Sequence, residues 1–182
     1  SADDAACARG GDLEDLIVNK HVGSILHTSP EDLSRAAKTV NEKSGLGIPL
    51  IIGDDCILDL LLAGRHYFPS QLGMAVSWDP DKVKAAGRAT AEEVSCTGVH
   101  WTFSPVLCIA RDTRWGVWMD FGEDPMLIGE LASAMVKGFK RAKAGEELPK
   151  NAILPAPNIS PANSETQGGR DAPKRTSPTA SS

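Results

Sequence analysis

Short apolar runs alternate with longer amphipathic segments along the chain up to about Lys140. The runs Val22–Leu26, Pro49–Gly53 and Val99–Phe103 are bounded by glycine, proline or polar residues, which is typical of buried strands. A fourth apolar run, Val106–Ala110, follows closely. Since strands alternate with helical segments, the pattern predicts βαβ units and an α/β fold with a parallel sheet.

Three of the intervening segments carry the same helix-start signal, an N-capping side chain followed by proline at the first helical position. A shorter apolar stripe near the beginning of the chain predicts one more helix. The predicted helices are Asp12–Lys20, Pro30 to about Lys43, Asp81 to about Cys96, and Pro125 through Lys140.

Polar residues follow two of the predicted strands, at the ends where parallel α/β folds gather their chemistry. Asp55 comes directly after the second strand, where a carboxylate can bind hydroxyl groups or a metal, or transfer protons. The alternative is an acid that caps the next helix. The loop Arg111–Gly116 combines two arginines, an aspartate and a tryptophan. This combination of residues indicates either a sugar-binding loop or an internal Arg–Asp pair that stabilises the strand end.

The remaining chemistry-bearing residues form no recognisable catalytic pattern. The acids of Phe121–Pro125 have a simple alternative as caps of the helix that follows. No histidine has a partner at ligand or triad spacing, and no serine lies in a nucleophile-elbow sequence. The residues concerned are His21, His27, His66 and His100, and Ser24, Ser70 and Ser104.

Composition narrows the class of protein. The 182 residues are 41% apolar and 24% charged, with a formal charge of −5, so we expect a soluble globular protein without a nucleic-acid or membrane partner. Four scattered cysteines predict neither a disulfide framework nor a metal site, and no cofactor motif is present. No aromatic residue occurs after Phe139. We therefore expect a folded part at 1–148 and a Pro/Ser-rich, disordered tail at 149–182.

A set of segments, in one order, resembles the N-terminal barrel domain of family 3 glycoside hydrolases of the bacterial β-glucosidase type. The resemblance implies a partial (β/α)8 TIM barrel, about the first four βα units, because a whole barrel needs about 250 residues. The segments are Leu46–Asp55, Phe68–Met74, Trp78–Pro80, Gly98–Pro105, Ile109–Asp112, Arg114–Gly116, Phe121–Pro125 and Ser164–Asp171.

The resemblance implies a retaining hydrolase of β-linked glucosides, with β-glucoside or glucose as ligand. In the family the nucleophile comes late in the barrel and the acid/base usually from a following domain. We therefore expect no catalytic residue in this chain and no activity of the chain alone. The alternative is a non-catalytic carbohydrate-binding or interaction fragment. The resemblance also favours a periplasmic or secreted location, although no signal segment is seen.

Matched residue by residue, Asp55 corresponds to the family's strand-end aspartate, which binds sugar hydroxyls. Three other recognition motifs differ. Val117 stands where an arginine is usual, Asn158–Ser160 where Lys-His-Phe is usual, and Leu58–Asp59 where His-Gly is usual.

The departures suggest a common cause. Codons for Lys-His-Phe-Ala-Gly, read one base out of frame, encode the residues Asn158–Ala162, and a similar shift accounts for Leu62–Phe68. We hypothesise that the sequence contains compensated and terminal frameshifts, which arose in a decayed gene or from sequencing errors.

Overall fold

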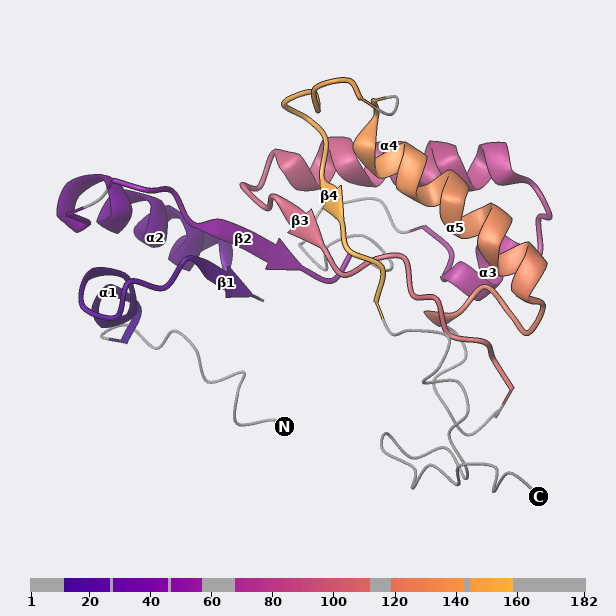
Figure 1. The fold of residues 1–182 in the computed structure, drawn as a ribbon, viewed down its shortest axis with the longest axis horizontal. Helices are drawn as coiled ribbons and strands as arrows, with labels where there is room; N and C mark the ends of the chain where they lie inside the picture. The colour runs from indigo at the N-terminus through magenta and orange to yellow at the C-terminus, as the bar shows by residue number, and fades with distance from the viewer. Residues whose placement is uncertain are drawn as a thin grey trace, which may run out of the picture.

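The computed structural model describes residues 12–26, 28–45, 47–56, 68–111, 119–142 and 145–158. These ranges contain five helices and four strands (Figure 1). None of these helices is long and apolar enough to cross a membrane. In chain order the elements are α1 (Asp12–Val18), β1 (Ser24–Leu26), α2 (Pro30–Lys43), β2 (Ile51–Asp54), α3 (Gln71–Ala75), α4 (Pro80–Ser95), β3 (Trp101–Thr102), α5 (Pro125–Lys140) and β4 (Leu154–Pro155).

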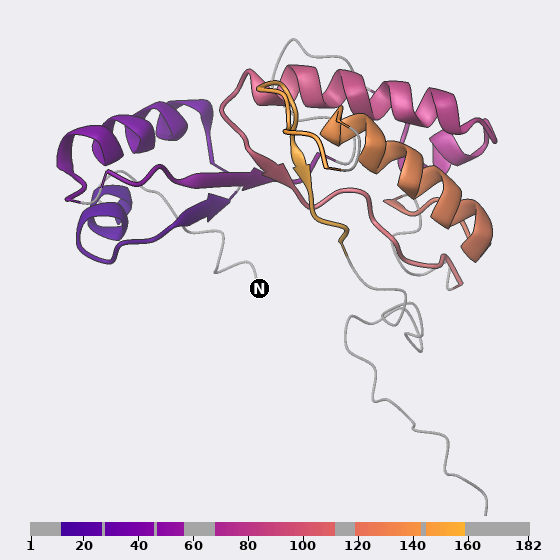
Figure 2. The same cartoon turned by 45° about the horizontal axis from the view of Figure 1, so that its top comes forward.

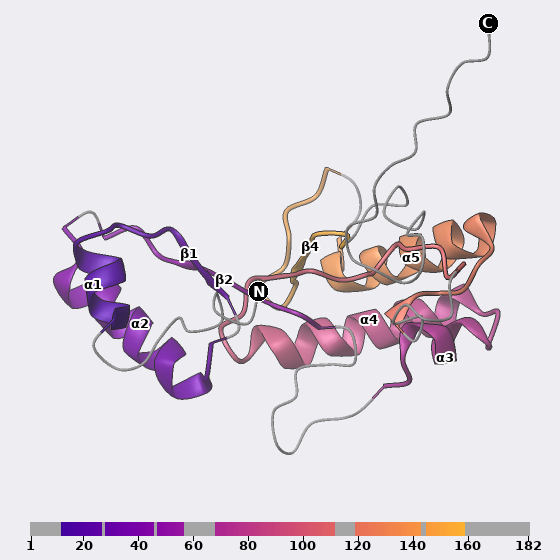
Figure 3. The same ribbon diagram turned by 90° about the horizontal axis from the view of Figure 1, so that it is seen from below.

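The four strands form one parallel sheet in the order β1-β2-β3-β4, so each strand pairs with the next one along the chain. The connecting helices α2 and α4 lie on the same side of the strands (Figures 2 and 3). Sequential parallel strands with helices on one side make part of a barrel, whereas a doubly wound sheet has helices on both faces. The predicted α/β class and partial barrel are confirmed.

The helix starts follow the predicted capping residues. Ser29 Oγ accepts a hydrogen bond from the Asp32 backbone N–H at 3.2 Å, and Pro30 follows as the first residue of α2. Asp124 caps α5 in the same way, accepting from Met126 N at 2.8 Å. The cap side chain satisfies N–H groups that have no partner inside the helix, so these starts depend on local sequence alone.

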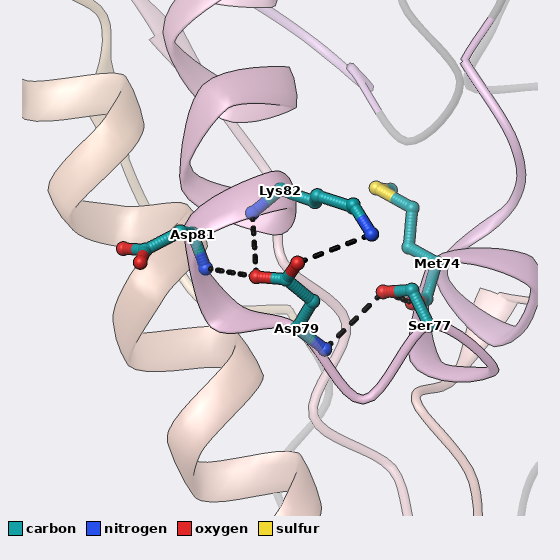
Figure 4. Close-up of polar contacts among 5 residues, drawn as sticks. All are labelled: Met74, Ser77, Asp79, Asp81 and Lys82. Carbon is teal, nitrogen blue, oxygen red and sulfur yellow. Dashed lines mark hydrogen bonds and ion pairs between the residues drawn. The ribbon is translucent and has the colours of Figure 1, made fainter.

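A connected turn joins α3 to α4 (Figure 4). Ser77 Oγ donates to Met74 O at 2.7 Å and accepts from Asp79 N at 3.3 Å. Asp79 then caps α4, with Oδ1 accepting from the backbone N–H groups of Asp81 and Lys82 at 3.1 and 3.2 Å. The Lys82 ammonium lies 3.2 Å from Asp79 Oδ2. This turn reverses the chain between the two helices.

The two faces of the sheet differ in burial. Ile25 and Ile52 face the helices and are each less than a tenth exposed, and Thr102 is fully buried on the same side. On the opposite face Leu26 and Leu154 are 43% and 50% exposed. The helix-covered face therefore holds the core, and the other face corresponds to the interior side of a barrel.

The helices α4 and α5 pack with their backbones close together. A Cβ placed on Gly87 of α4 would lie 2.8 Å from Met135 O. A Cβ on Gly138 of α5 would collide with Lys84 O and lie 2.9 Å from Arg88 N. The contact therefore depends on glycine in both helices. Around it α5 buries a large apolar stripe that includes Leu131, Met135 and Phe139.

The sheet extends past the boundary that composition predicted at Pro149. Ile153 is fully buried and its N–H donates to Phe139 O at 3.1 Å. Leu154 N donates to His100 O at 3.0 Å and thereby begins β4. Residues 149–158 are part of the folded unit, because the buried Ile153 and the backbone pairing of β4 hold them there. The absence of aromatic residues after Phe139 therefore did not mark the end of the folded part. Residues 159–182 lie outside the described part of the chain.

Candidate functional site

The carboxyl ends of β2, β3 and β4 meet at one edge of the sheet. Phe103 N donates to Asp54 O at 3.3 Å, which joins the ends of β2 and β3. Ala156 N donates to Thr102 O at 2.8 Å and joins β3 to β4. Residues that follow these strands are therefore held next to one another, as the parallel arrangement requires.

Asp55 is held in a turn that its neighbours stabilise. Asp54 Oδ1 accepts from Asp55 N at 2.8 Å, and the Cys56 N–H donates to Thr102 Oγ1 at 3.0 Å. Thr102 and Cys56 are buried, whereas Asp55 is half-buried. The backbone on both sides of Asp55 is thus tied to the sheet, and its carboxyl group lies at the end of an inner strand.

The alternative role of Asp55 as a helix cap is not seen in the described helices. After β2, the next described helix is α3, which Ser70 caps with Oγ accepting from Gly73 N at 3.2 Å. The helix after that is capped by Asp79. Residues 57–67, which separate Asp55 from α3, lie outside the described part of the chain.

An aromatic pair lies on the open face of the sheet below this edge. Trp101 pairs in register with Gly53, and a Cβ on that glycine would collide with the indole and approach Leu26 Cδ2 at 2.8 Å. The ring of Phe103 lies 4.3 Å from the indole, tilted by 60°. Gly53 therefore makes room for the indole. The sequence pattern did not mark Trp101 and Phe103 as a pair, although a glycine in a buried strand is a signal of close approach.

The loop after β3 is fixed from two sides. Gln71 of α3 is fully buried; its Nε2 donates to Val106 O at 3.0 Å and its Oε1 accepts from Val106 N at 2.9 Å. On the other side Asn158 N donates to Pro105 O at 2.9 Å, and Leu107 N donates to Asn158 O at 3.0 Å. Asn158 thus follows β4 at the same edge as Asp55, at the position where the resemblance expects a sugar-binding lysine.

Another acid, Asp120, has a fully buried side chain. Burial raises the pKa of Asp120 to about 6, and a hydrogen bond with the Cys108 thiol offsets part of that rise. Asp120 could not be identified from the sequence, because nothing in the local sequence distinguishes this buried aspartate from the exposed Glu123 and Asp124.

The other predicted residues have simpler roles or lie outside the described ranges. Asp124 caps α5, so the capping interpretation of Phe121–Pro125 holds for it. Arg111 is exposed, and the rest of its loop, 112–118, is not described. His100 Nδ1 accepts from Ile52 N at 3.2 Å. Within the described residues no three side chains are grouped as metal ligands, and Cys56, Cys96 and Cys108 are free thiols.

Comparison with known families decides where this fold belongs. Residues 8–176 match the model of the glycosyl hydrolase family 3 N-terminal domain. The chain belongs to glycosyl hydrolase family 3. As a family 3 sheet, its open face is the interior of the barrel, and the edge that carries Asp55 is the end where such barrels place their active sites.

Related family 3 proteins include β-glucosidases. The chain is 32% identical to the periplasmic β-glucosidase of Salmonella typhimurium over 130 residues, which are 70% of this chain and 16% of that protein. It is 82% identical, with a TM-score of 0.84, to a structure of a β-glucosidase involved in saponin metabolism from intestinal bacteria, covering 91% of this chain and 22% of that one.

The β-glucosidase of Listeria innocua, solved in complex with glucose, shares 31% identity at a TM-score of 0.62, over 74% of this chain and 18% of that one. The chain thus spans less than a quarter of the length of these three relatives.

Proposed function

We propose that this chain is part of the barrel of a retaining β-glucosidase-like hydrolase, and that Asp55 binds hydroxyl groups of the sugar ring that is released. The observation that carries the proposal is the position of Asp55, half-buried at the carboxyl end of an inner strand of a family 3 sheet. A carboxylate accepts hydrogen bonds from two neighbouring hydroxyl groups, which suits a pyranose ring.

Retaining glycosidases need two carboxyl groups about 5 Å apart on either side of the scissile bond, one as nucleophile and one as acid/base. Asp55 orients the substrate in this proposal and takes neither role. The nucleophile and acid/base belong to parts of the family pattern that this chain does not match. We therefore propose that the 182-residue chain binds sugar but does not hydrolyse glycosides by itself.

Two departures from the family pattern lead us to expect weak sugar binding. Asn158 stands where a lysine is usual, so a cationic donor to the sugar is lost at the end of β4. Val117 stands where an arginine is usual. With Asp55 as the remaining matched contact, we expect a dissociation constant in the millimolar range, about −4 kcal/mol.

Turnover is tested with a chromogenic β-glucoside and the purified chain. The expected result is no release of chromophore above the rate of the buffer, since no pair of carboxyl groups flanks the sugar. Turnover that follows the chain through purification and is lost on heating would contradict the proposed inactivity.

Sugar binding is tested by titrating glucose and following backbone amide shifts by NMR. Shifts are expected at the ends of β2 and β3, and Asp55→Asn should weaken binding by about tenfold, since hydrogen bonds to a charged group are stronger than neutral ones. Asp81→Asn, an exposed acid on α4, is the matched control and should bind glucose normally. Equal binding by both variants would exclude Asp55 as the contact.

A further inference from the structure

A basic groove lies where the end of α5 meets the middle of α4. Figure 1 shows these two helices packed side by side. Its volume is about 950 Å³, and Gly145, Glu146 and Leu148 of the loop that leads into β4 also line it. This loop precedes the strand, so the groove lies toward the amino ends of the strands. The cationic residues that line it are Lys84, Arg88, Lys137, Lys140 and Arg141.

Few acidic groups balance these cations. Glu92 lies between two of them: its Oε1 is 3.0 Å from Arg141 Nη2 and 3.4 Å from Arg88 Nε. Glu146 is the acidic residue among the described lining residues. Five cations against two carboxylates leave a surplus of three positive charges. The whole chain carries −5, so the groove opposes the overall charge.

The helix dipole explains only part of this cluster. Lys137 and Lys140 occupy the last turn of α5, where cations stabilise the negative end of a helix. Lys84 and Arg88 lie in the middle of α4, one turn apart, where the dipole has no such effect. Arg88 also forms an i,i+4 ion pair with Glu92 in α4, whereas no ion pair within α4 accounts for Lys84 among the described residues. The placement of both cations opposite the end of α5 concentrates positive charge at the groove.

Arg141 also lines the groove. The residue takes the left-handed conformation at the end of α5, with φ of 54°, and its side chain is only 16% exposed. Its Nη2 is engaged by Glu92, while its Nη1 is buried and has no hydrogen-bond partner within the described residues. Arg141 therefore contributes the positive charge of a partly buried guanidinium to the groove.

We propose that this groove binds a small ligand that carries two or more phosphate groups. The cations converge from two helices around a concavity, which suits a compact ligand better than an extended polyanion. Arginine pairs with phosphate in a bidentate manner, and the lysines supply further charge. The apolar side chains of Val136 and Leu148 also line the groove and would contact the organic part of such a ligand. The site is independent of the sugar-binding function proposed for Asp55.

The test is calorimetric titration of the chain with pyrophosphate in phosphate-free buffer, with circular dichroism to verify folding. Saturable binding at one site is expected, and Lys137→Gln/Lys140→Gln should weaken it by about tenfold or more. The charge-matched control is Lys38→Gln/Lys43→Gln on α2, outside the groove, which should bind normally. Arg141→Gln provides an independent second variant and should also weaken binding. Glucose should not compete.

Four outcomes would overturn the proposal. One is the absence of saturable binding up to about 10 mM pyrophosphate. Another is an equal loss in the groove and control variants, which indicates unspecific attraction to positive charge. The third is concentration-dependent dimerisation that pyrophosphate reverses, since the groove would then hold an acidic surface of a second copy. Orthophosphate should bind at least about tenfold more weakly than pyrophosphate, and equal affinities would contradict a site for several phosphate groups.

Discussion

The side-chain amide of Gln71 makes both backbone hydrogen bonds of Val106, donating to its carbonyl at 3.0 Å and accepting from its N–H at 2.9 Å. Gln71 thereby acts as a short substitute for a neighbouring strand. Both residues are almost fully buried, so water cannot replace either bond. This pair connects α3 to the loop after β3.

Gln71→Leu should lower the free energy of unfolding by about 2–4 kcal/mol, because it leaves one buried donor and one buried acceptor unpaired. Urea unfolding monitored by circular dichroism measures the change. Gln71→Glu keeps an acceptor for Val106 N but loses the donor to Val106 O. Equal stability of wild type and Gln71→Leu would show that the pair does not secure this loop.

Gly138→Ala should destabilise the chain by about 2 kcal/mol or more, because the new Cβ meets the backbone of α4 rather than a flexible side chain. The matched control is Gly129→Ala in the same helix, where nothing lies within 4 Å of the new Cβ. That change should stabilise the chain by about 0.5–1 kcal/mol, since alanine favours helix more than glycine does. Thermal unfolding of both variants gives the comparison, and a loss of stability in both would contradict the close packing of α4 and α5.

Asp79→Ala should lower Tm, because the first turn of α4 loses the acceptor of two backbone N–H groups and the partner of Lys82. Asp79→Asn keeps the cap and should lie between wild type and Asp79→Ala. The hydrogen bond from Lys82 lowers the pKa of Asp79, so this stabilisation should disappear as the pH falls through that lowered value. Calorimetry at neutral and acidic pH tests both points, and an unchanged Tm for Asp79→Ala would contradict the capping role.

Stability should also depend on the protonation of Asp120. Burial raises the pKa of Asp120 to about 6 in the folded chain, whereas its ordinary value is 3.8. As the pH rises, the unfolded chain therefore loses this proton at a lower pH than the folded chain does. The free energy of unfolding should therefore fall by on the order of 2 kcal/mol as the pH rises from about 4 to 6, and stay level above. Asp120→Asn should remove this dependence, whereas Asp81→Asn should keep it. A denaturant series at several pH values measures it.

The outline of the candidate site was accessible from sequence, but its details were not. Asp55 could be placed at a strand end because an apolar run preceded it and the resemblance assigned it a role. Asp120 and Trp101 could not be selected, because their environment comes from segments far away in the chain. The role of the loop Arg111–Gly116, as a sugar-binding loop or an internal Arg–Asp pair, remains a prediction, because residues 112–118 lie outside the described part of the chain.

The sequence by itself determined the α/β class, the starts of α2, α4 and α5, and the family. Helix caps and strand periodicity act within a few residues, so they are readable without a structure. The tertiary structure decided the rest. α3 and β4 are too short to show a period of their own, and they exist because Gln71 reaches Val106 and Ile153 is buried beside α5. The basic groove likewise exists only because glycine brings α4 and α5 together, which places charges about 50 residues apart in the chain around one cavity.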